Sequence, residues 1–246
     1  MSATRGEHEQ LFNEPFIDGL SSLVAAAHEL KSPLALVRQL SLMIEEGGVS
    51  DDEKQRMLRQ ISLTSERGLR LTSDLTRSVR LNDALFELEP INPRQLCEDV
   101  IRELSPLFEA HNRSIKLTSR KHPLLLVANR DLLRRILVNF SDNALHYSDG
   151  HHELQINIGS LNSGRLIRLG IRDYGPAIPS DMMRSLKSKL AIAPMPIQAR
   201  PQSSGLGLYI ASQFAAVMNG SIGVIHHRDG TTFYVDLQAS SQLSLL

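Results

Sequence analysis

The chain has 246 residues, enough for one large domain or two modest domains that each bury a core. Its 27 basic residues balance its 27 acidic residues, so the net charge gives no electrostatic reason to expect nucleic acid or a membrane surface as a partner. Cys97 is the only cysteine, which excludes an internal disulfide and a multi-cysteine zinc site. No apolar run reaches the ~18 to 20 residues that a membrane helix needs, and the N-terminus lacks the apolar region of a signal peptide, so we expect a soluble, cytoplasmic protein without a membrane segment.

The first third of the chain is predicted to form two helices. Over residues 15–46 apolar side chains recur at spacings of three and four, which indicates a helix whose apolar stripe needs a partner. Glycines at 47–48 end this helix, Ser50 or Asp51 can cap the next, and the pattern continues to about Leu81. Because an antiparallel hairpin leaves one apolar side of each helix exposed, we expect two chains to pack as a four-helix bundle in a homodimer.

His28 is the candidate nucleophile of the first helix. A neutral imidazole attacks well near pH 7, and the carboxylate of Glu29 can take or orient the proton on its other nitrogen. Ser32 lies on the same helix face one turn on, and Pro33 should bend the helix beside His28. The alternatives are a solvated surface histidine and a tolerated kink, and only the rest of the chain can decide between them.

The character of the sequence changes near residues 82–92, which indicates a domain boundary. Residues 86–89 alternate as a short strand, and Pro93 suits the first turn of a helix that reaches about Ala110. Because the strands and helices that follow are mixed without regular alternation, we expect the α+β class, with a layered sandwich. The further predicted strands are 114–119, 124–127, 154–160, 166–172, 221–226 and 232–237, and the further helices are 131–147 and 206–218.

Three polar motifs of the second domain suit a nucleotide. Asn139 and Asn143 lie one turn apart on a predicted helix, and carboxamide oxygens suit Mg²⁺ that is held mainly by phosphates and water. Asp173 ends a predicted strand, where its carboxylate can accept a hydrogen bond from an exocyclic amine such as that of adenine. Gly205 and Gly207 open a helix, so a phosphate can approach bare N–H groups. Neither the dinucleotide fingerprint nor the P-loop pattern fits these glycines.

Taken in order, these motifs resemble the catalytic core of a two-component sensor histidine kinase over residues 15–240. The run from His28 to Leu34 resembles its H box, Asn139 to Tyr147 its N box, and Asp173 to Gly175 and Gly205 to Leu208 its G1 and G2 boxes. The resemblance implies an N-terminal extension (1–14), a dimerisation and histidine phosphotransfer hairpin (15–82), a Bergerat-type ATP-binding domain (83–241) and a C-terminal tail (242–246).

The resemblance also implies a function and a set of site residues. The chain would phosphorylate His28 with Mg-ATP, assisted by Glu29, and pass the phosphoryl group to an aspartate of a response regulator. Ser32 stands where Thr or Asn commonly supports phosphatase activity. Asn143 would coordinate Mg²⁺ with help from Asn139, and Asp173 would read the adenine amine. The full set implied for ATP is Asn139, Asn143, His146, Tyr147, Asp173, Gly175, Ala177, Gly205, Leu206, Gly207, Leu208 and Thr231.

Several positions depart from the family pattern. His146 replaces a common Lys or Arg, Ala177 replaces a glycine, and residues 182–202 lack the phenylalanine pair that usually precedes the ATP lid. We therefore expect autophosphorylation with an altered lid closure, in which the basic residues of 187–200 could still reach the phosphates. The alternatives are a degenerate kinase that acts as a nucleotide-binding dimeric scaffold, and an ATPase of this fold, which leaves the H box unexplained. Too few residues precede His28 for a sensor domain, so we expect input from a partner or from a longer protein.

Overall fold

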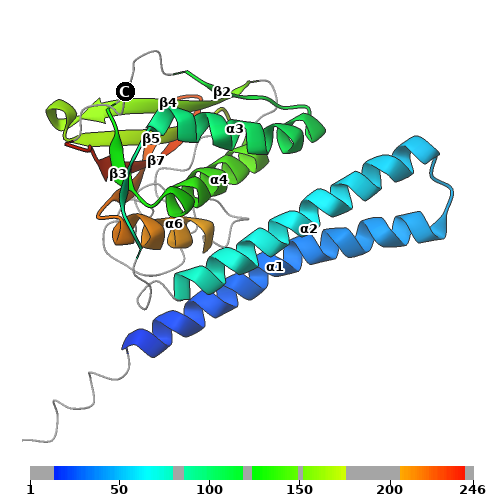
Figure 1. Cartoon of the computed structure of the whole chain (residues 1–246). Coiled ribbons are helices and arrows are strands. Elements are labelled where there is room, and N and C mark those ends of the chain that lie inside the picture. The colour runs from blue at the N-terminus through cyan, green and yellow to red at the C-terminus, as the bar shows by residue number, and fades with distance from the viewer. Residues whose placement is uncertain (1–13, 80–85, 119–123, 149–151, 176–205, 242–246) are drawn as a thin grey trace, which may run out of the picture.

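A computed structural model describes residues 14–79, 86–118, 124–148, 152–175 and 206–241 (Figure 1). The side chains of residues 14–26, 28, 29, 78, 79, 146, 147 and 206 lie outside this description. The molecule consists of a long helical hairpin, residues 14–79, and an α+β domain, residues 86–241, that packs against it (Figure 1). No helix in these ranges combines the length and the apolar character needed to cross a bilayer.

The hairpin consists of two antiparallel helices, α1 (Glu14–Glu46) and α2 (Asp51–Val79). Helix α1 continues through Pro33, and Gly47 and Gly48 follow its last turn with φ of 77° and 82°. Ser50 and Glu53 begin α2 as a reciprocal pair: the N–H of Ser50 donates to Oε2 of Glu53 at 2.9 Å, and the N–H of Glu53 donates to Oγ of Ser50 at 3.3 Å. The predicted hairpin is thus confirmed, and Ser50 is the cap.

Large apolar side chains on the hairpin face solvent. Leu34, Leu58 and Leu69 are 66%, 51% and 71% exposed. Fully burying one leucine contributes roughly 1.5 to 3 kcal/mol, so a second copy that covered these side chains would gain stability. The homodimer stays a prediction.

The α+β domain places three helices on one face of a five-stranded sheet, and a separate two-stranded sheet adjoins the C-terminal end of β7 (Figure 1). The strand order in the larger sheet is β2-β4-β5-β7-β6, in which β2 and β4 are parallel and the other neighbours are antiparallel. This layered arrangement confirms the predicted α+β class. The elements are β1 (Glu89–Ile91), α3 (Pro93–Ala110), β2 (Ile115–Leu117), β3 (Leu126–Ala128), α4 (Arg130–Tyr147), β4 (Leu154–Leu161), the short helix η1 (Asn162–Gly164), β5 (Leu166–Asp173), α6 (Leu206–Val217), β6 (Ser221–His227) and β7 (Gly230–Gln238).

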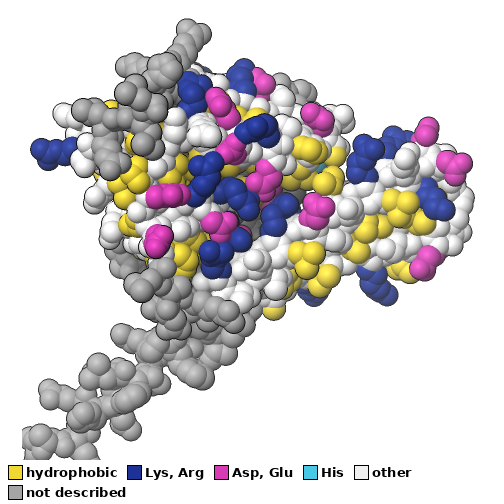
Figure 2. Space-filling view, viewed as in Figure 1, with side chains coloured by type: hydrophobic (Ala, Val, Ile, Leu, Met, Phe, Trp, Pro, Cys, Tyr) yellow, Lys and Arg dark blue, Asp and Glu magenta, His cyan; other side chains and the backbone are white. Residues whose placement is uncertain are grey.

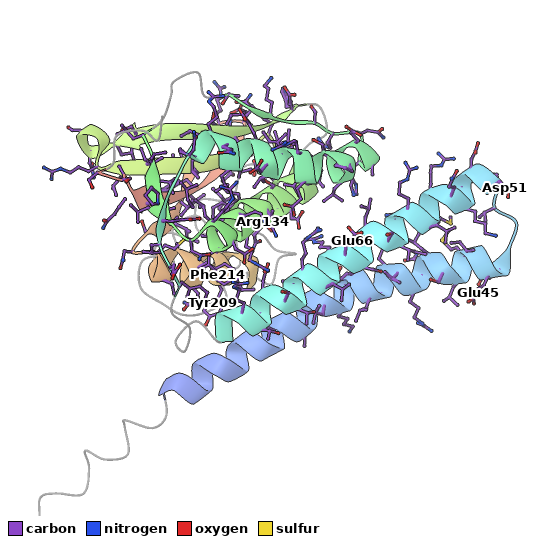
Figure 3. All side chains as sticks on the ribbon, in the orientation of Figure 1. Glu45, Asp51, Glu66, Arg134, Tyr209 and Phe214 are labelled. Carbon is purple, nitrogen blue, oxygen red and sulfur yellow. The ribbon has the colours of Figure 1, made fainter. Side chains whose placement is uncertain are left out.

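The core lies between the sheet and its helices. Every second residue of β5 faces the helices, and Ile167, Leu169 and Ile171 are at most 1% exposed. Helix α4 contributes its predicted apolar face to the same core, and Phe214 anchors α6 there (Figure 3). Burial raises the pKa of Cys97 to about 12, so this thiol stays protonated and unreactive at neutral pH.

The first strand of the domain lies further along the chain than predicted. The predicted strand 86–89 is wrong in position because β1 begins only at Glu89, where Pro90 pairs with Val127 of β3. Phe86 instead packs against the core, with its ring 5.8 Å from the guanidinium carbon of Arg77. The register is set by the partner strand, which local alternation does not reveal.

Ion pairs join α2 to α4 and so hold the domain against the hairpin. Arg135 of α4 pairs with Asp74 of α2, and Arg77 Nη1 of α2 lies 2.8 Å from Asp131 Oδ2 of α4. Figure 2 shows basic and acidic side chains gathered over this part of the surface. Burial raises the pKa of Asp74 although Arg135 opposes the shift. Desolvation therefore offsets part of the attraction between these charges.

Asp142 is a largely buried carboxylate at this junction. Its Oδ2 is 3.8 Å from Nη2 of Arg70, and its Oδ1 is buried without a hydrogen-bond partner among the described residues. Burial raises the pKa of Asp142 above the ordinary 3.8; Arg67 and Arg70 oppose the shift, whereas Glu103 and Asp74 add to it. The carboxyl of Asp142 thus binds its proton more tightly in the native state than in the unfolded state. The free energy of unfolding therefore falls as the pH rises above 3.8 through the native pKa.

We predict that Asp142→Asn raises the unfolding midpoint at pH 8, because the amide keeps the shape and removes the buried charge. A gain of ~1 kcal/mol corresponds to about 2 to 4 °C in a chain of this size. Thermal unfolding of the wild type and the variant at pH 8 and pH 5 measures the effect. The difference between their unfolding midpoints should be smaller at pH 5. A variant that is less stable at pH 8 would mean that the ion pair with Arg70 outweighs the cost of burial.

Candidate nucleotide-binding site

Asp173 and Thr231 lie together at one end of the central strands. Asp173 is the last residue of β5, Thr231 is the second residue of β7, and the two are paired in the antiparallel register. The N–H of Thr231 donates to Oδ1 of Asp173 at 2.8 Å, and the two residues are 0% and 1% exposed. A buried carboxylate fixed by a backbone N–H is a well-oriented acceptor for a further donor.

The surroundings of this pair fit a polar ring system. The hydroxyl of Thr231 is buried and has no hydrogen-bond partner among the described residues, whereas buried polar groups are nearly always paired. Gly230 has a φ of 146°, and a Cβ there would collide with the carbonyl oxygen of Asp173 and lie 2.9 Å from its Oδ1. Glycine thus allows β7 to begin directly against the Asp173 carboxylate.

Asn139 connects α4 to the first turn of α6. Its Nδ2 donates to the carbonyl oxygen of Gly207 at 2.8 Å, and both residues are half-buried. Asn143, one helical turn further along α4, is also half-buried. The structure therefore brings the two predicted asparagines and the glycine-bearing helix start to one region of the domain. The N-terminus of a 12-residue helix, with its free N–H groups, favours an anion.

Gly207 is in direct contact with Asn139, and this contact predicts the effect of a substitution. A Cβ at Gly207 would collide with the amide oxygen of Asn139, so Gly207→Ala must displace the side chain or the helix start. We expect ATP affinity to fall about tenfold, which is ~1.4 kcal/mol and close to the cost of one lost hydrogen bond. Titration calorimetry with ATP measures it.

Gly159→Ala is the matched control because a Cβ at Gly159 in β4 would meet nothing within 4 Å. This variant should bind ATP as the wild type does. A folded Gly207→Ala protein with unchanged affinity would exclude Gly207 from the nucleotide site.

The C-terminal end of α4 is tied to the end of β5. Oγ of Ser148, which follows α4, donates to the carbonyl oxygen of Tyr174 at 2.9 Å. Nη2 of Arg113 donates to the carbonyl oxygen of Ser148 at 2.7 Å. These bonds hold the predicted Asp173 to Gly175 turn beside the helix that carries the two asparagines.

Other predicted site residues lie partly or wholly outside the description. Ala177, Gly205 and the lid segment 182–202 are not among the described residues, and the side chains of His28, Glu29, His146, Tyr147 and Leu206 are not described. His28 and Glu29 lie within α1, where Ser32 is exposed, and His146 and Tyr147 form the last turn of α4. Leu208 is buried in the core at 3% exposure. The roles of these residues stay predictions.

The donor atoms present suit a metal that is held mainly by its ligand. Across the described residues, no group of three His, Cys, Asp or Glu side chains is placed to hold a metal ion. Asn139 uses its amide nitrogen on Gly207, so its carbonyl oxygen is the atom that could bind a cation. Carbonyl oxygens of this kind suit Mg²⁺ carried on phosphates.

Comparison with known proteins agrees with this geometry. Residues 128–241, which include Asn139, Asp173, Gly207 and Thr231, match the family of histidine kinase-, DNA gyrase B-, and HSP90-like ATPases. Over 215 residues, or 86% of the chain, the sequence is 28% identical to the histidine protein kinase SaeS of Staphylococcus epidermidis. The chain is thus similar to histidine protein kinases, and its C-terminal part is similar to this ATPase family. The chain spans 61% of the length of that relative.

Two solved structures share the fold of this chain. Full-length ShkA in complex with AMPPNP superposes with a TM-score of 0.58 at 20% identity, over 92% of this chain and 47% of that chain. Histidine kinase ThkA in complex with the response regulator protein TrrA has a TM-score of 0.58 at 16% identity, over 87% of this chain and 60% of that chain. Both likenesses support the hairpin followed by an α+β domain.

Sequence reasoning missed two charged residues of this region. Arg172 precedes Asp173 and is only 8% exposed, and its Nη2 lies 2.5 Å from Oδ1 of Asp229. A sequence pattern gives no sign of this pair because 57 positions separate its members.

Proposed function

We propose that this chain is a protein-histidine kinase core that moves the γ-phosphoryl group of ATP to His28 and then to an aspartate of a response regulator. The observation that supports the proposal most strongly is that the α+β domain contains two tertiary hydrogen bonds between candidate site residues. One joins Asp173 to Thr231, and the other joins Asn139 to Gly207. The same chain carries His28 on a helix of the adjoining hairpin.

ATP would lie between these two contacts. Asp173 would accept a hydrogen bond from the adenine amine, with the buried hydroxyl of Thr231 beside it. The first turn of α6, near Gly207, would receive phosphate oxygens at its N–H groups. The other residues of the proposed nucleotide-binding set are Tyr147, His146, Gly175, Ala177, Gly205, Leu206 and Leu208.

Asn143 and Asn139 would hold Mg²⁺ through their carboxamide oxygens. Bound there, the ion would neutralise charge on the phosphates. The chain's own contribution is the placement of the two asparagines one turn apart on α4, together with the Asn139 bond to Gly207 that fixes one amide.

Phosphoryl transfer requires a neutral nitrogen on His28. Its lone pair attacks the γ-phosphorus, a P–N bond forms, and the bond from that phosphorus to the bridging oxygen breaks, so ADP leaves. Glu29 takes or orients the proton on the other ring nitrogen. In the second step a receiver carboxylate attacks the same phosphorus, the P–N bond breaks, and an acyl phosphate forms.

The proposed partners follow from the same scheme. A response regulator receives the phosphoryl group, and the complex of ThkA with TrrA supports this class of partner. A second copy of the chain would cover the exposed leucines of the hairpin as a homodimer. The chain would act in the cytoplasm as a transferase and phosphoprotein of a two-component system.

The alternative is a degenerate kinase that binds nucleotide and acts as a dimeric scaffold. Both functions need the Asp173 and Asn139 contacts, so the geometry of the ATP region does not separate them. The H box favours the kinase because a scaffold has no need of a nucleophile followed by a carboxylate.

Incubation of the chain with γ-labelled ATP and Mg²⁺ tests the proposal. A kinase acquires label that is lost in acid and retained in base, as expected of a phosphoramidate. ATP binding by calorimetry without any such label would support the scaffold instead. Absence of both label and binding would overturn the two functions together.

A further inference from the structure

We propose that Arg172 is a positioning residue that holds the base-binding end of the nucleotide site through Asp229. The inference rests on the proposed function, because it assigns a role within the same ATP site. It starts from the burial of the Arg172 side chain, which is 10% exposed at the end of β5. A buried guanidinium is retained only where partners offset its desolvation, so its contacts identify what it holds together.

Two hydrogen bonds define the Arg172 clamp, which consists of Arg172, Asp173 and Asp229. Nη1 of Arg172 donates to the backbone carbonyl of Asp173 at 2.8 Å, and Nη2 donates to Oδ1 of Asp229 at 2.5 Å. Asp229 lies in the turn between β6 and β7, directly before Gly230 and Thr231. One rigid guanidinium therefore joins the end of β5 to the turn that presents Thr231.

Aromatic contacts extend the clamp on its other side. The guanidinium carbon of Arg172 is 4.5 Å from the ring centroid of Tyr174, and the ring of Tyr174 stacks on His152 with centroids 4.9 Å apart. A cation over an aromatic face adds attraction when it is shielded from water. Arg172 thus contacts the residue that follows Asp173 as well as the turn that precedes Thr231.

The clamp acts on the nucleotide through the Thr231 bond to Asp173. Gly230 lies directly against Arg172 and Asp173, since a Cβ there would be 2.9 Å from Nη1 of Arg172 and from Oδ1 of Asp173. If the turn moved away, the N–H of Thr231 would leave Oδ1 of Asp173, and the carboxylate would lose its fixed orientation. Base recognition depends on that orientation, whereas phosphate binding at α6 does not.

The same strand supplies a matched comparison in Arg168. Its Nε and Nη2 donate to the two carboxylate oxygens of Asp236 at 2.7 and 2.6 Å, and its guanidinium carbon lies 3.4 Å from the ring centroid of Tyr234. The ion pair and the aromatic partner are of the same kind as those of Arg172. Arg168 pairs with Asp236 in the register between β5 and β7, five pairs away from the pair of Asp173 and Thr231. Its loss should affect stability without affecting the base.

The experiment compares Arg172→Met with Arg168→Met for binding of ATP and GTP by calorimetry, with thermal unfolding as a check on folding. Methionine keeps an unbranched apolar stem and removes every donor. We expect Arg172→Met to weaken ATP binding about tenfold, which is the scale of one hydrogen bond to a fixed acceptor. The variant should also show a smaller preference for ATP over GTP. Arg168→Met should stay within about twofold of the wild type. Arg172→Lys, which keeps the charge without the planar fork, should recover part of the affinity.

The outcomes separate the two levels of the proposal. If the wild-type chain binds neither nucleotide, the proposed function fails. If the wild type binds ATP and the two methionine variants bind it equally, the assignment of Arg172 is overturned. Should Arg172→Met fail to fold, Asp229→Ala decides, because the Asp229 side chain is 65% exposed and its removal leaves the core intact. A loss of ATP-over-GTP preference in Asp229→Ala supports the clamp, and an unchanged preference refutes it.

Discussion

A His28→Gln variant is expected to take up no phosphoryl label from γ-labelled ATP while it binds ATP as tightly as the wild-type chain. Glutamine has a similar length and polarity but no nitrogen lone pair that can attack phosphorus, so the acceptor is lost and the helix is kept. His28 belongs to α1, whereas the candidate ATP residues belong to the α+β domain. Electrophoresis measures the phosphoryl label retained on the protein, and calorimetry measures the affinity for ATP separately.

His226→Gln is the matched control for this experiment. His226 is an exposed histidine of β6, so its replacement should leave both label and binding unchanged. Acid-labile label that survives in His28→Gln at the wild-type level would assign the acceptor to another residue. Loss of ATP binding in the same variant would show that the substitution damages the domain.

Asp173→Asn is expected to weaken ATP binding about 100-fold, ~2.7 kcal/mol, the scale of a lost hydrogen bond to a charged group. The substitution keeps the shape of a residue that is 1% exposed and whose Oδ1 accepts the N–H of Thr231 at 2.8 Å. If the amide oxygen keeps that bond, the amide nitrogen points at the adenine amine, and two donors then face each other. Calorimetry measures the affinity, and label yield at low ATP concentration should fall in parallel.

Asp236→Asn provides the comparison for Asp173→Asn. Asp236 is also a paired carboxylate of the central strands, but its partner is Arg168 on the sheet face away from the helices. Its replacement should lower thermal stability and leave ATP affinity unchanged. Equal losses of affinity in the two variants would point to a general effect on the sheet and would remove Asp173 from its proposed role.

The sequence predicts those features whose causes are local. The helix predicted over 131–147 is Arg130–Tyr147 in the structure, because a 3.6-residue apolar period depends only on neighbours along the chain. The strand predicted over 166–172 and the turn after it predict that Asp173 lies at a strand end, and Asp173 is the last residue of β5. The strand predicted over 86–89 is wrong in position because its pairing with β3 depends on residues some 40 positions away in the chain.

The candidate site divides in the same way. Residue type and spacing identified Asn139, Asn143, Asp173 and Gly207 as candidates, and the family resemblance added Thr231. No spacing rule shows that Asn139 donates to Gly207, 68 positions away, or that Arg172 pairs with Asp229, 57 positions away. The same holds for the pairing of Arg135 with Asp74 across the junction with the hairpin, 61 positions apart.

By itself the sequence determined the hairpin, the α+β class and the chemical groups that a phosphoryl donor and acceptor need, since periodicity, capping and residue type act over a few positions. Only the tertiary structure decided which of those groups meet. Side chains far apart in sequence come within hydrogen-bond distance only when the sheet closes and the helices pack on it. For that reason the clamp of Arg172 on Asp229 and the ion pairs between α2 and α4 emerged from the folded chain alone.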